Sequence, residues 1–340
     1  MSRTDFPKQF LDILGTGKTL IQATFDRFAL FIQKENIYVV TTSQYKHIVM
    51  EQLPALQPEN ILCEPARKNT ATCIAYISYR LRQINPEANL ICAPADHVIL
   101  DDAGFKQTCM EALDFTQNIK GLITLGIKPT YPNTGYGYIQ YEPLAVSENI
   151  YKVKTFTEKP DKELADTFIQ SGDFLWNAGI FVWKIKNIIA AFEKFLPEMH
   201  EVFDAEKNNF NTAAETEAIE RIYPQCINIS IDYGVMEKAD NVYIIPSSFG
   251  WSDLGTWASA YDNLEKDYLE NAVAGSNVII IDATKNIVHA NNKKLVLLQG
   301  LDDFIVVDTK DVLLICKKEK EQDIKEYVAE VRRNKGDKYL

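Results

Sequence analysis

The chain has 340 residues, 46% of them hydrophobic and 24% charged, so it can bury a substantial core in one large and one smaller domain. Its net charge of −11 argues against nonspecific nucleic-acid binding, which depends on clustered positive charge. The sequence contains no apolar run of membrane-spanning length, no signal peptide and no C-x-x-C cysteine pair. We therefore expect a cytoplasmic protein with no membrane partner, no nucleic-acid partner and reduced cysteines.

The first half of the sequence alternates helix-like and strand-like segments. Apolar spacing predicts helices over residues 18–33, 43–53, 69–82 and 101–117, and apolar runs predict strands over residues 37–41, 90–93 and 122–127. Asn69 or Thr70 is the expected N-cap of the third helix. This rhythm is typical of a Rossmann-like α/β fold, with a mixed, mostly parallel sheet covered by helices.

The second half of the sequence changes character after Trp257. Before it, strands are predicted at residues 138–141, 151–156, 178–184 and 242–246, with a long helical stretch at 185–223. After it, short strands follow closely at residues 278–282, 287–290, 294–299, 304–308 and 312–316, before a charged helix at 319–332. We expect a large domain over residues 1–268 and a small all-β, β-helix-like domain with a closing helix over residues 269–340.

A short glycine-containing loop near the start resembles the end of a phosphate-binding P-loop. It reads Gly-Thr-Gly-Lys-Thr at residues 15–19, but the motif needs a further glycine where Asp12 stands. The preceding residues 7–10, Pro-Lys-Gln-Phe, also make a poor central strand. A turn before a helix is the favoured interpretation, and an ATPase rests on this loop alone.

Two aspartates directly follow predicted strands. Asp96 lies in Pro-Ala-Asp-His at residues 94–97, and Asp253 lies in Gly-Trp-Ser-Asp-Leu-Gly at residues 250–255. Ligands of open α/β sheets bind outside the carboxyl ends of strands, and Mg²⁺ prefers oxygen ligands. The pair predicts a shared Mg²⁺ site, although Asp96 taken alone is more typical of a cap or turn, and Asp253 could belong to a tight interdomain turn anchored by Trp257.

Polar side chains also flank the strands of the middle region. Glu158 and Lys159 end a strand, where a carboxylate would accept hydrogen bonds from sugar hydroxyls and an ammonium would contact a phosphate. Taken in isolation, the two residues are more typical of a solvated charge pair before a helix. Asn177 lies beside Gly179 before another strand and could donate to and accept from a hydroxyl. Gly137, between two tyrosines, would shape a pocket or form a hairpin bend.

The segment Glu-Pro-Ala-Arg-Lys-Asn-Thr at residues 64–70 precedes a predicted helix. The start of a helix favours anions, and Glu64 and Asn69 could instead bind the hydrogen-bonding edge of a base. Plain capping of the helix by Asn69 or Thr70 is the alternative.

Taken together, the order and wording of these stretches resemble the sugar-phosphate nucleotidyltransferases, and within them the mannose-1-phosphate guanylyltransferase branch. The matching stretches are FPKQFL at residues 6–11, EPARKNTA at 64–71, PADH at 94–97, TGYGYI at 134–139, FTEKP at 156–160, WNAGIF at 176–181, SIDYGVMEK at 230–238 and GWSDLGTW at 250–257. The resemblance extends to about residue 260, and the all-β tail is like that of the family's short form.

The resemblance implies a reaction in which GTP and mannose 1-phosphate give GDP-mannose and pyrophosphate, with Mg²⁺ as the cofactor. It implies that Asp96 and Asp253 bind the metal, and that Lys159 holds the sugar phosphate. Lys8 matches the lysine that closes the family's signature loop and contacts phosphates. These four residues are the expected catalytic set.

The resemblance further implies that Glu158 and Asn177 bind the sugar hydroxyls. Gly137 would belong to the same sugar-nucleotide pocket, and Glu64 and Asn69 would line the nucleotide pocket. Another base or sugar 1-phosphate, or a noncatalytic sugar-nucleotide-binding subunit, are alternatives that remain open at this point. The sequence also leaves a homodimer open.

The family opens with a strand and a glycine-rich loop that carries an arginine and ends just before a segment like Ser2-Arg3. The backbone N–H groups of that loop hold the triphosphate, and it does not precede Ser2 here. We expect either that the real start lies upstream of Met1, which we favour, or that the chain is a truncation with severely reduced turnover.

Overall fold

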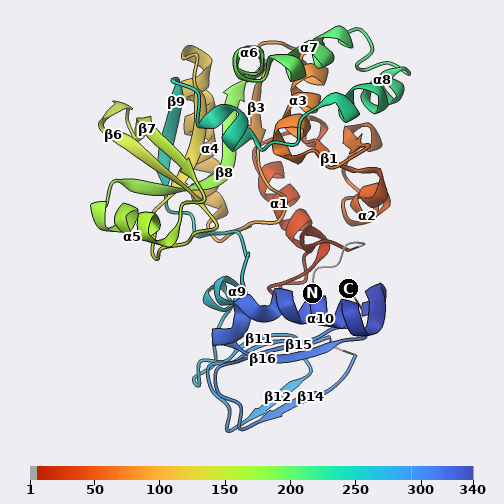
Figure 1. The fold of residues 1–340 in the computed structure, drawn as a ribbon, viewed down its shortest axis with the longest axis vertical. Helices are drawn as coiled ribbons and strands as arrows, with labels where there is room; N and C mark the ends of the chain where they lie inside the picture. The colour runs from red at the N-terminus through yellow and green to blue at the C-terminus, as the bar shows by residue number, and fades with distance from the viewer. Residues whose placement is uncertain (1–5, 292, 340) are drawn as a thin grey trace. The chain divides into compact units, whose positions relative to one another are not determined.

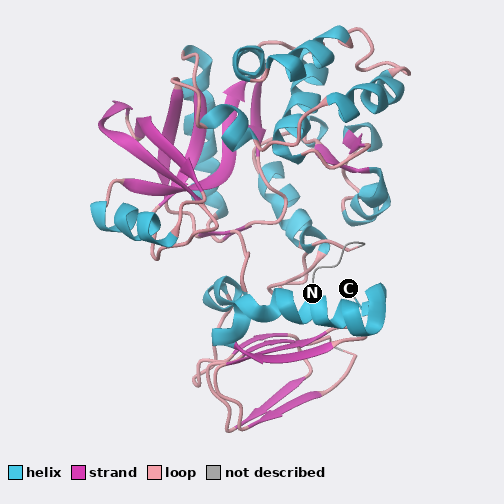
Figure 2. Ribbon diagram, viewed as in Figure 1, coloured by secondary structure: helices cyan, strands magenta, loops and turns pink. Residues whose placement is uncertain are grey.

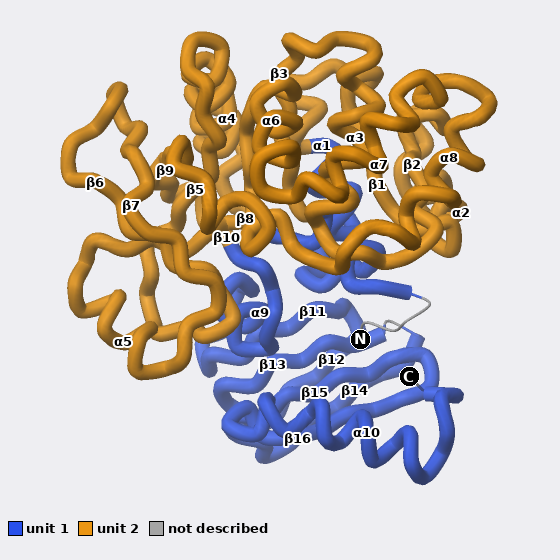
Figure 3. Tube along the Cα trace, turned by 45° about the horizontal axis from the view of Figure 1, so that its top comes forward, with its two compact units in different colours: residues 1–26, 95–98, 252–340 blue, residues 27–94, 99–251 orange. Residues whose placement is uncertain are grey.

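The computed structural model describes residues 6–291 and 293–339 (Figure 1). The chain divides into two compact units (Figure 3). The first unit comprises residues 1–26, 95–98 and 252–340, and the second comprises residues 27–94 and 99–251. The predicted domain boundary between residues 268 and 269 stays a prediction. Across the described ranges, no helix has both the length and the apolar character that crossing a bilayer requires.

A six-stranded mixed sheet forms the centre of the second unit (Figure 2). In spatial order its strands are β3 (Asn89–Cys92), β8 (Phe174–Lys184), β5 (Leu122–Ile127), β9 (Val242–Ser247), β7 (Ile150–Glu158) and β6 (Gly137–Ser147). β3, β5, β6 and β9 run in one direction, and β7 and β8 run in the other. The predicted mixed α/β sheet is confirmed, and most of its strands share a direction. Because β8 inserts between β3 and β5, however, the described neighbours are parallel only at β5 and β9.

Helices cover both faces of this sheet, as the sequence predicts. α4 (Asp102–Asn118) packs on one face, where Ile123 and Leu125 of β5 join its core. The opposite face is covered by α3 (Asn69–Arg82), α6 (Ile185–Phe195), α7 (Pro197–Ala205) and α8 (Glu215–Ile222). Leu122 of β5 belongs to this second core, because side chains of a strand alternate between the two faces.

The remaining elements of the second unit are short. They are η2 (Lys34–Asn36), β1 (Val39–Thr42), η3 (Ser43–Tyr45), α2 (Lys46–Gln52), η4 (Pro58–Asn60), β2 (Ile61–Glu64), α5 (Lys162–Ser171), η5 (Tyr223–Gln225) and the π-helix η6 (Asp232–Met236). β4 (Val98–Ile99), β10 (Trp251–Ser252) and α1 (Leu20–Ala29) lie where the chain passes from one unit to the other. The helical stretch predicted at 185–223 is three helices, since Pro197 begins α7 and favours the first position of a new helix.

The C-terminal part of the first unit is β-helix-like, as predicted. β11 (Ala272–Ala274), β13 (Ile287–His289) and β15 (Phe304–Asp308) form a parallel sheet, which β16 (Leu313–Lys317) extends antiparallel. β12 (Val278–Ile281) and β14 (Val296–Gln299) form a second parallel pair. Val288, Leu298 and Val306 pack in one core of this domain.

The opposite face of the larger C-terminal sheet belongs to a separate core. Ile287 and Ile305 pack there with Ile13 and Leu254, which come from distant parts of the sequence. The helical elements of this unit are η1 (Lys8–Phe10), α9 (Trp257–Asn263), η7 (Lys318–Asp323), α10 (Ile324–Lys335) and η8 (Gly336–Tyr339). The N-terminal segment therefore folds onto the C-terminal domain within one unit.

The loop that resembles a P-loop is a turn. The backbone N–H groups of Thr16 and Gly17 donate to the carboxylate of Asp12, at 3.0 and 2.7 Å. A P-loop would offer such N–H groups to a phosphate. Here a side chain of the loop itself accepts them, so the ATPase interpretation has no structural support.

Two buried asparagines connect successive turns of the β-helix-like domain. Asn271 Oδ1 accepts from both the backbone N–H and the side-chain amide of Asn286, each at 3.0 Å. Asn286 also donates to the Leu301 carbonyl and accepts from the Phe304 N–H, both at 2.9 Å. The Asn286 side chain thus bonds to side-chain and backbone groups on both sides of its own turn.

We predict that Asn286→Ala lowers the free energy of unfolding by about 3 kcal/mol, because it removes three side-chain hydrogen bonds and leaves the Phe304 N–H without its acceptor. Urea unfolding of the variant and the wild type measures this difference. Asn36→Ala, at an exposed position, is the control and should change stability little. A loss below about 0.5 kcal/mol in Asn286→Ala would contradict the role of the buried amide.

Candidate active site

Three of the predicted catalytic residues converge within the first unit. Lys8 Nζ lies 3.0 Å from Asp96 Oδ2 and donates to the main-chain oxygen of Asp253 at 2.5 Å. The Asp96 side chain is 35% exposed, so its carboxylate remains accessible to a ligand. We call these residues, Lys8, Asp96 and Asp253, the Lys8 cluster. The structure thus brings the side chains of Lys8 and Asp96 together with the main chain of Asp253, which lies 245 positions from Lys8.

The loop of Asp253 has a tightly defined backbone. Asp253 Oδ1 accepts from the Gly255 N–H at 2.8 Å, and a Cβ at position 255 would lie 2.7 Å from Asp253 Oδ2. Leu254 adopts a φ of 45°, and its buried side chain packs in the core of the first unit. A branched residue persists in this conformation only where its surroundings hold it, so packing of Leu254 fixes the loop.

The donors of the Lys8 cluster fit a hard divalent cation. Carboxylate and carbonyl oxygens surround the ammonium of Lys8, which shows that this position already accommodates a positive charge. Mg²⁺ is commonly held by one or two carboxylates and completes its coordination with water and substrate phosphates. Within residues 6–291 and 293–339, no three His, Cys, Asp or Glu side chains group so as to hold a metal by themselves. Water and substrate oxygens would therefore complete the coordination.

A second group of predicted residues converges in the second unit, at the end of β7. Glu158 Oε1 lies 3.0 Å from Lys159 Nζ, and the Glu158 N–H donates to Glu237 Oε1 at 3.0 Å. Glu158 Oε2 is buried and has no hydrogen-bond partner among the described residues. A Cβ on Gly137 would collide with this oxygen, so only glycine fits beside it. Most buried polar atoms have a hydrogen-bond partner, so this unpartnered acceptor suits a hydroxyl donor from a ligand.

Asn177 lies in the same region but is largely engaged by the protein. Its Oδ1 accepts from Thr124 Oγ1 at 2.9 Å and from the Gly179 N–H at 3.1 Å. Its Nδ2 donates to Asp232 Oδ1 at 2.7 Å. These partners fix the orientation of the amide. If Asn177 contacts a sugar hydroxyl as predicted, it does so through its second Nδ2 hydrogen.

Asp232 is the principal residue that the sequence analysis missed. It begins η6, where the Glu237 N–H donates to the Asp232 carbonyl at 2.9 Å. This π-type bond places two carboxylates one turn apart, and such turns are frequent at functional sites. The stretch at residues 230–238, which resembles the family, was the available signal. Asp232 was missed because this stretch follows no strand, and site residues were sought at the ends of strands. We call Glu158, Lys159, Asn177, Asp232 and Glu237 the Glu158 cluster.

The titration behaviour of this cluster reflects burial and like charge. Burial, followed by the charge of Asp232, raises the pKa of Glu158 above its usual value. Burial also raises the pKa of Asp232, partly offset by hydrogen bonds that include the one from Asn177. Burial lowers the pKa of Lys159, but the hydrogen bond and charge of Glu158 outweigh it and leave that pKa raised. Three carboxylates share one lysine, so a ligand that donates hydrogen bonds would be favoured.

Glu64 and Asn69 contact a different set of residues, at the corner between β2 and α3. Glu64 Oε1 accepts from the Tyr223 hydroxyl at 2.9 Å, and burial raises the pKa of Glu64 to about 6. Asn69 has a φ of 66°, and its Oδ1 accepts from the Thr70 N–H at 2.9 Å.

The expected side-chain N-cap of α3 was wrong. Its N-cap is Lys68, which makes no side-chain cap. The Thr70 hydroxyl instead accepts from the Ile231 N–H at 2.9 Å, which ties the start of α3 to the residue before η6.

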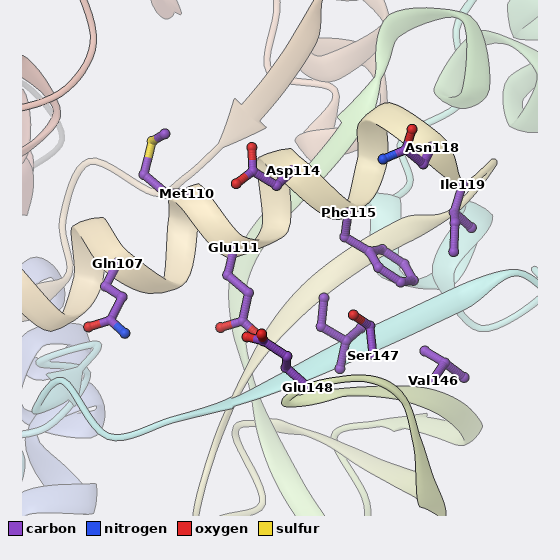
Figure 4. Close-up of a pocket in the computed structure, with 11 residues that line it drawn as sticks. Gln107, Met110, Glu111, Asp114, Phe115, Asn118, Ile119, Val146, Ser147 and Glu148 are labelled. Carbon is purple, nitrogen blue, oxygen red and sulfur yellow. The ribbon is translucent and has the colours of Figure 1, made fainter.

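A surface pocket of about 650 Å³ lies between α4 and the end of the β6–β7 hairpin (Figure 4). No predicted site residue lines it. Glu111, Asp114 and Glu148 do, and Figure 4 shows the carboxylates of Glu111 and Glu148 pointing toward one another. Burial, with a contribution from Glu148, raises the pKa of Glu111. A pocket lined by these acids does not suit a nucleotide or a sugar phosphate.

Residues 2–270 match the protein family described as Nucleotidyl transferase. The chain belongs to this family. Residues 276–331 match the MannoseP isomerase/GMP-like beta-helix domain. The resemblance identified from the sequence is therefore confirmed at the level of the family and of the C-terminal β-helix-like fold.

Several known proteins are similar over nearly the whole chain. Alginate biosynthesis protein AlgA of Pseudomonas putida is 35% identical over 332 residues, which cover 96% of this chain and 67% of that protein. Mannose-1-phosphate guanylyltransferase RfbM of Salmonella typhimurium is 32% identical over 344 residues, covering 100% and 71%. A crystal structure described as mannose-1-phosphate geranyltransferase from Thermus thermophilus aligns with a TM-score of 0.87 at 28% identity, covering 97% of this chain and 94% of that one.

We predict that Asn177→Ala raises the pKa of Asp232 further, because the variant removes a hydrogen bond that favours the ionised carboxylate. A carboxyl-carbon NMR titration of Asp232 in both proteins measures the change. Asn118→Ala, at an exposed position of α4, is the control. An unchanged or lower pKa of Asp232 in Asn177→Ala would show that the amide does not stabilise its charge.

Proposed function

We propose that this chain transfers a guanylyl group from GTP to mannose 1-phosphate and releases GDP-mannose and pyrophosphate. The observation that carries this proposal is the similarity to RfbM, a mannose-1-phosphate guanylyltransferase, over the full length of this chain. The Lys8 cluster suits metal and phosphate binding, and the Glu158 cluster suits sugar binding, so both clusters support the proposal. A homodimer stays a prediction.

The Glu158 cluster has the chemistry of a sugar subsite. In this proposal the buried Glu158 Oε2 accepts a hydroxyl of mannose, and Asp232 accepts a second one. Asn177 holds Asp232 through its Nδ2 and offers its remaining hydrogen to the sugar. Lys159 is more than half exposed, so its ammonium can turn from Glu158 toward the sugar phosphate.

The Lys8 cluster has the chemistry of a metal and phosphate subsite. Asp96 and Asp253 would hold Mg²⁺, which when bound neutralises phosphate charge and polarises the phosphorus under attack. Lys8 would leave its contact with Asp96 to meet phosphate oxygens, keeping the local charge balanced. In this proposal Glu64 accepts N–H donors of guanine, and Asn69 contributes to the same nucleotide pocket.

The reaction requires no covalent intermediate with the protein. A phosphate oxygen of mannose 1-phosphate attacks the α-phosphorus of GTP and forms the new P–O bond. The bond from the α-phosphorus to the bridging oxygen breaks on the opposite side, and the electron pair leaves with pyrophosphate. Lys8 and Lys159 hold the anionic groups, and the carboxylates orient the sugar, so the protein contributes positioning and charge stabilisation.

We predict that Asp96→Ala lowers kcat at least roughly 100-fold, because it removes a ligand of the metal that stabilises phosphate charge. Release of pyrophosphate from GTP and mannose 1-phosphate, with Mg²⁺, measures the rate. Asp114→Ala, which changes an exposed acid on α4, is the matched control and should leave kcat unchanged. Wild-type turnover in Asp96→Ala would remove the metal assignment. A wild-type protein without turnover would contradict the proposed function itself.

We predict that the KM for GTP rises as the pH falls from 7.5 to 5.5. Glu64 has a raised pKa of about 6, so its ionised, accepting form is dominant above pH 6 and is lost below it. At pH 5.5 the ionised fraction is roughly a quarter, which corresponds to a rise in KM of about fourfold. The same measurement of KM against pH with Glu64→Gln controls for protonation of GTP itself. An equal rise in both proteins would exclude Glu64 from base recognition.

A further inference from the structure

One carboxylate of the C-terminal domain contacts the helix that follows the Asp253 loop. Glu321 lies in η7, between β16 and α10. Its Oε1 accepts from the Trp257 N–H, and its Oε2 accepts from the Ala258 N–H at 3.1 Å. Trp257 is the first residue of α9, four positions after Asp253. Both groups lie within the first unit, together with the whole Lys8 cluster.

This contact completes the hydrogen bonding at the start of α9. The first N–H groups of a helix have no partner within the helix and carry partial positive charge. The Thr256 side chain caps the Ser259 N–H in a capping box, and Glu321 accepts the two N–H groups between them. A carboxylate bound to two such donors is held firmly, since charge-assisted hydrogen bonds are the stronger kind.

A second contact connects the same two elements. Lys318 Nζ lies 3.6 Å from the centroid of the Tyr261 ring, which is on α9. Tyr261 and Trp257 also pack in the core that contains Ile305 and Cys316 of the C-terminal sheet. η7 therefore fixes both the start and one side of α9.

The path from α9 back to Asp253 is short and constrained. Thr256 is the N-cap of α9, and the preceding Gly255 donates its N–H to Asp253 Oδ1 at 2.8 Å. Leu254 keeps its positive φ by packing in the core of the first unit. A shift of the start of α9 would be transmitted through these residues to the Asp253 carboxylate.

We propose that Glu321 is a positioning residue through which the C-terminal β-helix-like domain sets the affinity of the Asp253 loop for Mg²⁺. The inference rests on the proposed function for the identity of the metal and the reaction. It gives the C-terminal domain a role in metal binding without placing any of its residues in contact with substrate. A residue that holds a metal ligand in place typically changes metal affinity or activity by about 10–100-fold when it is removed.

The test compares wild-type protein with Glu321→Gln, which loses the charge and one of the two acceptor oxygens. We expect the Mg²⁺ concentration for half-maximal turnover to rise about tenfold. Hydrogen–deuterium exchange should accelerate in the peptide covering residues 253–258. Calorimetric binding of mannose 1-phosphate, assigned to the Glu158 cluster, should stay unchanged. Glu319→Gln is the matched control, because Glu319 lies in the same η7, is exposed and should alter none of these readouts.

Unchanged Mg²⁺ dependence in a folded Glu321→Gln would overturn the inference. If that variant fails to fold, Glu321→Asp decides, because its shorter side chain keeps the charge but cannot reach both N–H groups. A wild-type Mg²⁺ dependence of Glu321→Asp would again overturn it. If the wild type shows no guanylyl transfer, the proposed function fails, and exchange and calorimetric Mg²⁺ binding then decide the inference without any substrate.

Discussion

The ammonium of Lys8 makes the contact on which the proposed metal and phosphate chemistry of the first unit depends. It joins the Asp96 carboxylate to the Asp253 main chain, and so links three segments that are remote in sequence. An ion pair this exposed contributes little to stability on its own. Its role is to position groups: without any ligand, it holds the Asp96 carboxylate and the Asp253 main-chain oxygen next to the ammonium of Lys8. The buried Leu254 and the Glu321 contact then fix the loop behind Asp253.

The Glu158 cluster differs from the Lys8 cluster, because its three carboxylates outnumber its single lysine. Burial raises the pKa values of Glu158 and Asp232, so keeping both ionised near neutral pH costs folding free energy. Such a cost is tolerated where ligand binding offsets it, and carboxyl groups with shifted pKa values are concentrated at functional sites. Hydroxyl groups of a sugar would satisfy these acceptors without adding charge. In the proposed function the Lys8 cluster supplies charge neutralisation and the Glu158 cluster supplies hydroxyl binding.

Much of this account could be predicted from the sequence, for a physical reason. Asp96, Asp253, Glu158 and Lys159 lie near strand ends, where strand periodicity and the geometry of α/β sheets indicate a site. Asp232 and Glu321 follow no such rule, because a π-type turn and a contact across 64 positions in the sequence arise only from tertiary packing. The antiparallel insertion of β8 was missed for the same reason, since strand patterns reveal burial but not strand order.

We propose that this chain joins GMP from GTP to mannose 1-phosphate. The most direct measurement is kcat/KM for pyrophosphate release with GTP, ATP, UTP and dTTP, each paired with mannose 1-phosphate or glucose 1-phosphate, with the sugar nucleotide identified by mass spectrometry. We expect kcat/KM for GTP with mannose 1-phosphate to exceed that of every other pair by at least about tenfold, and the product to be GDP-mannose. A higher kcat/KM with UTP or dTTP, or saturable GDP-mannose binding without any pyrophosphate release, would contradict it.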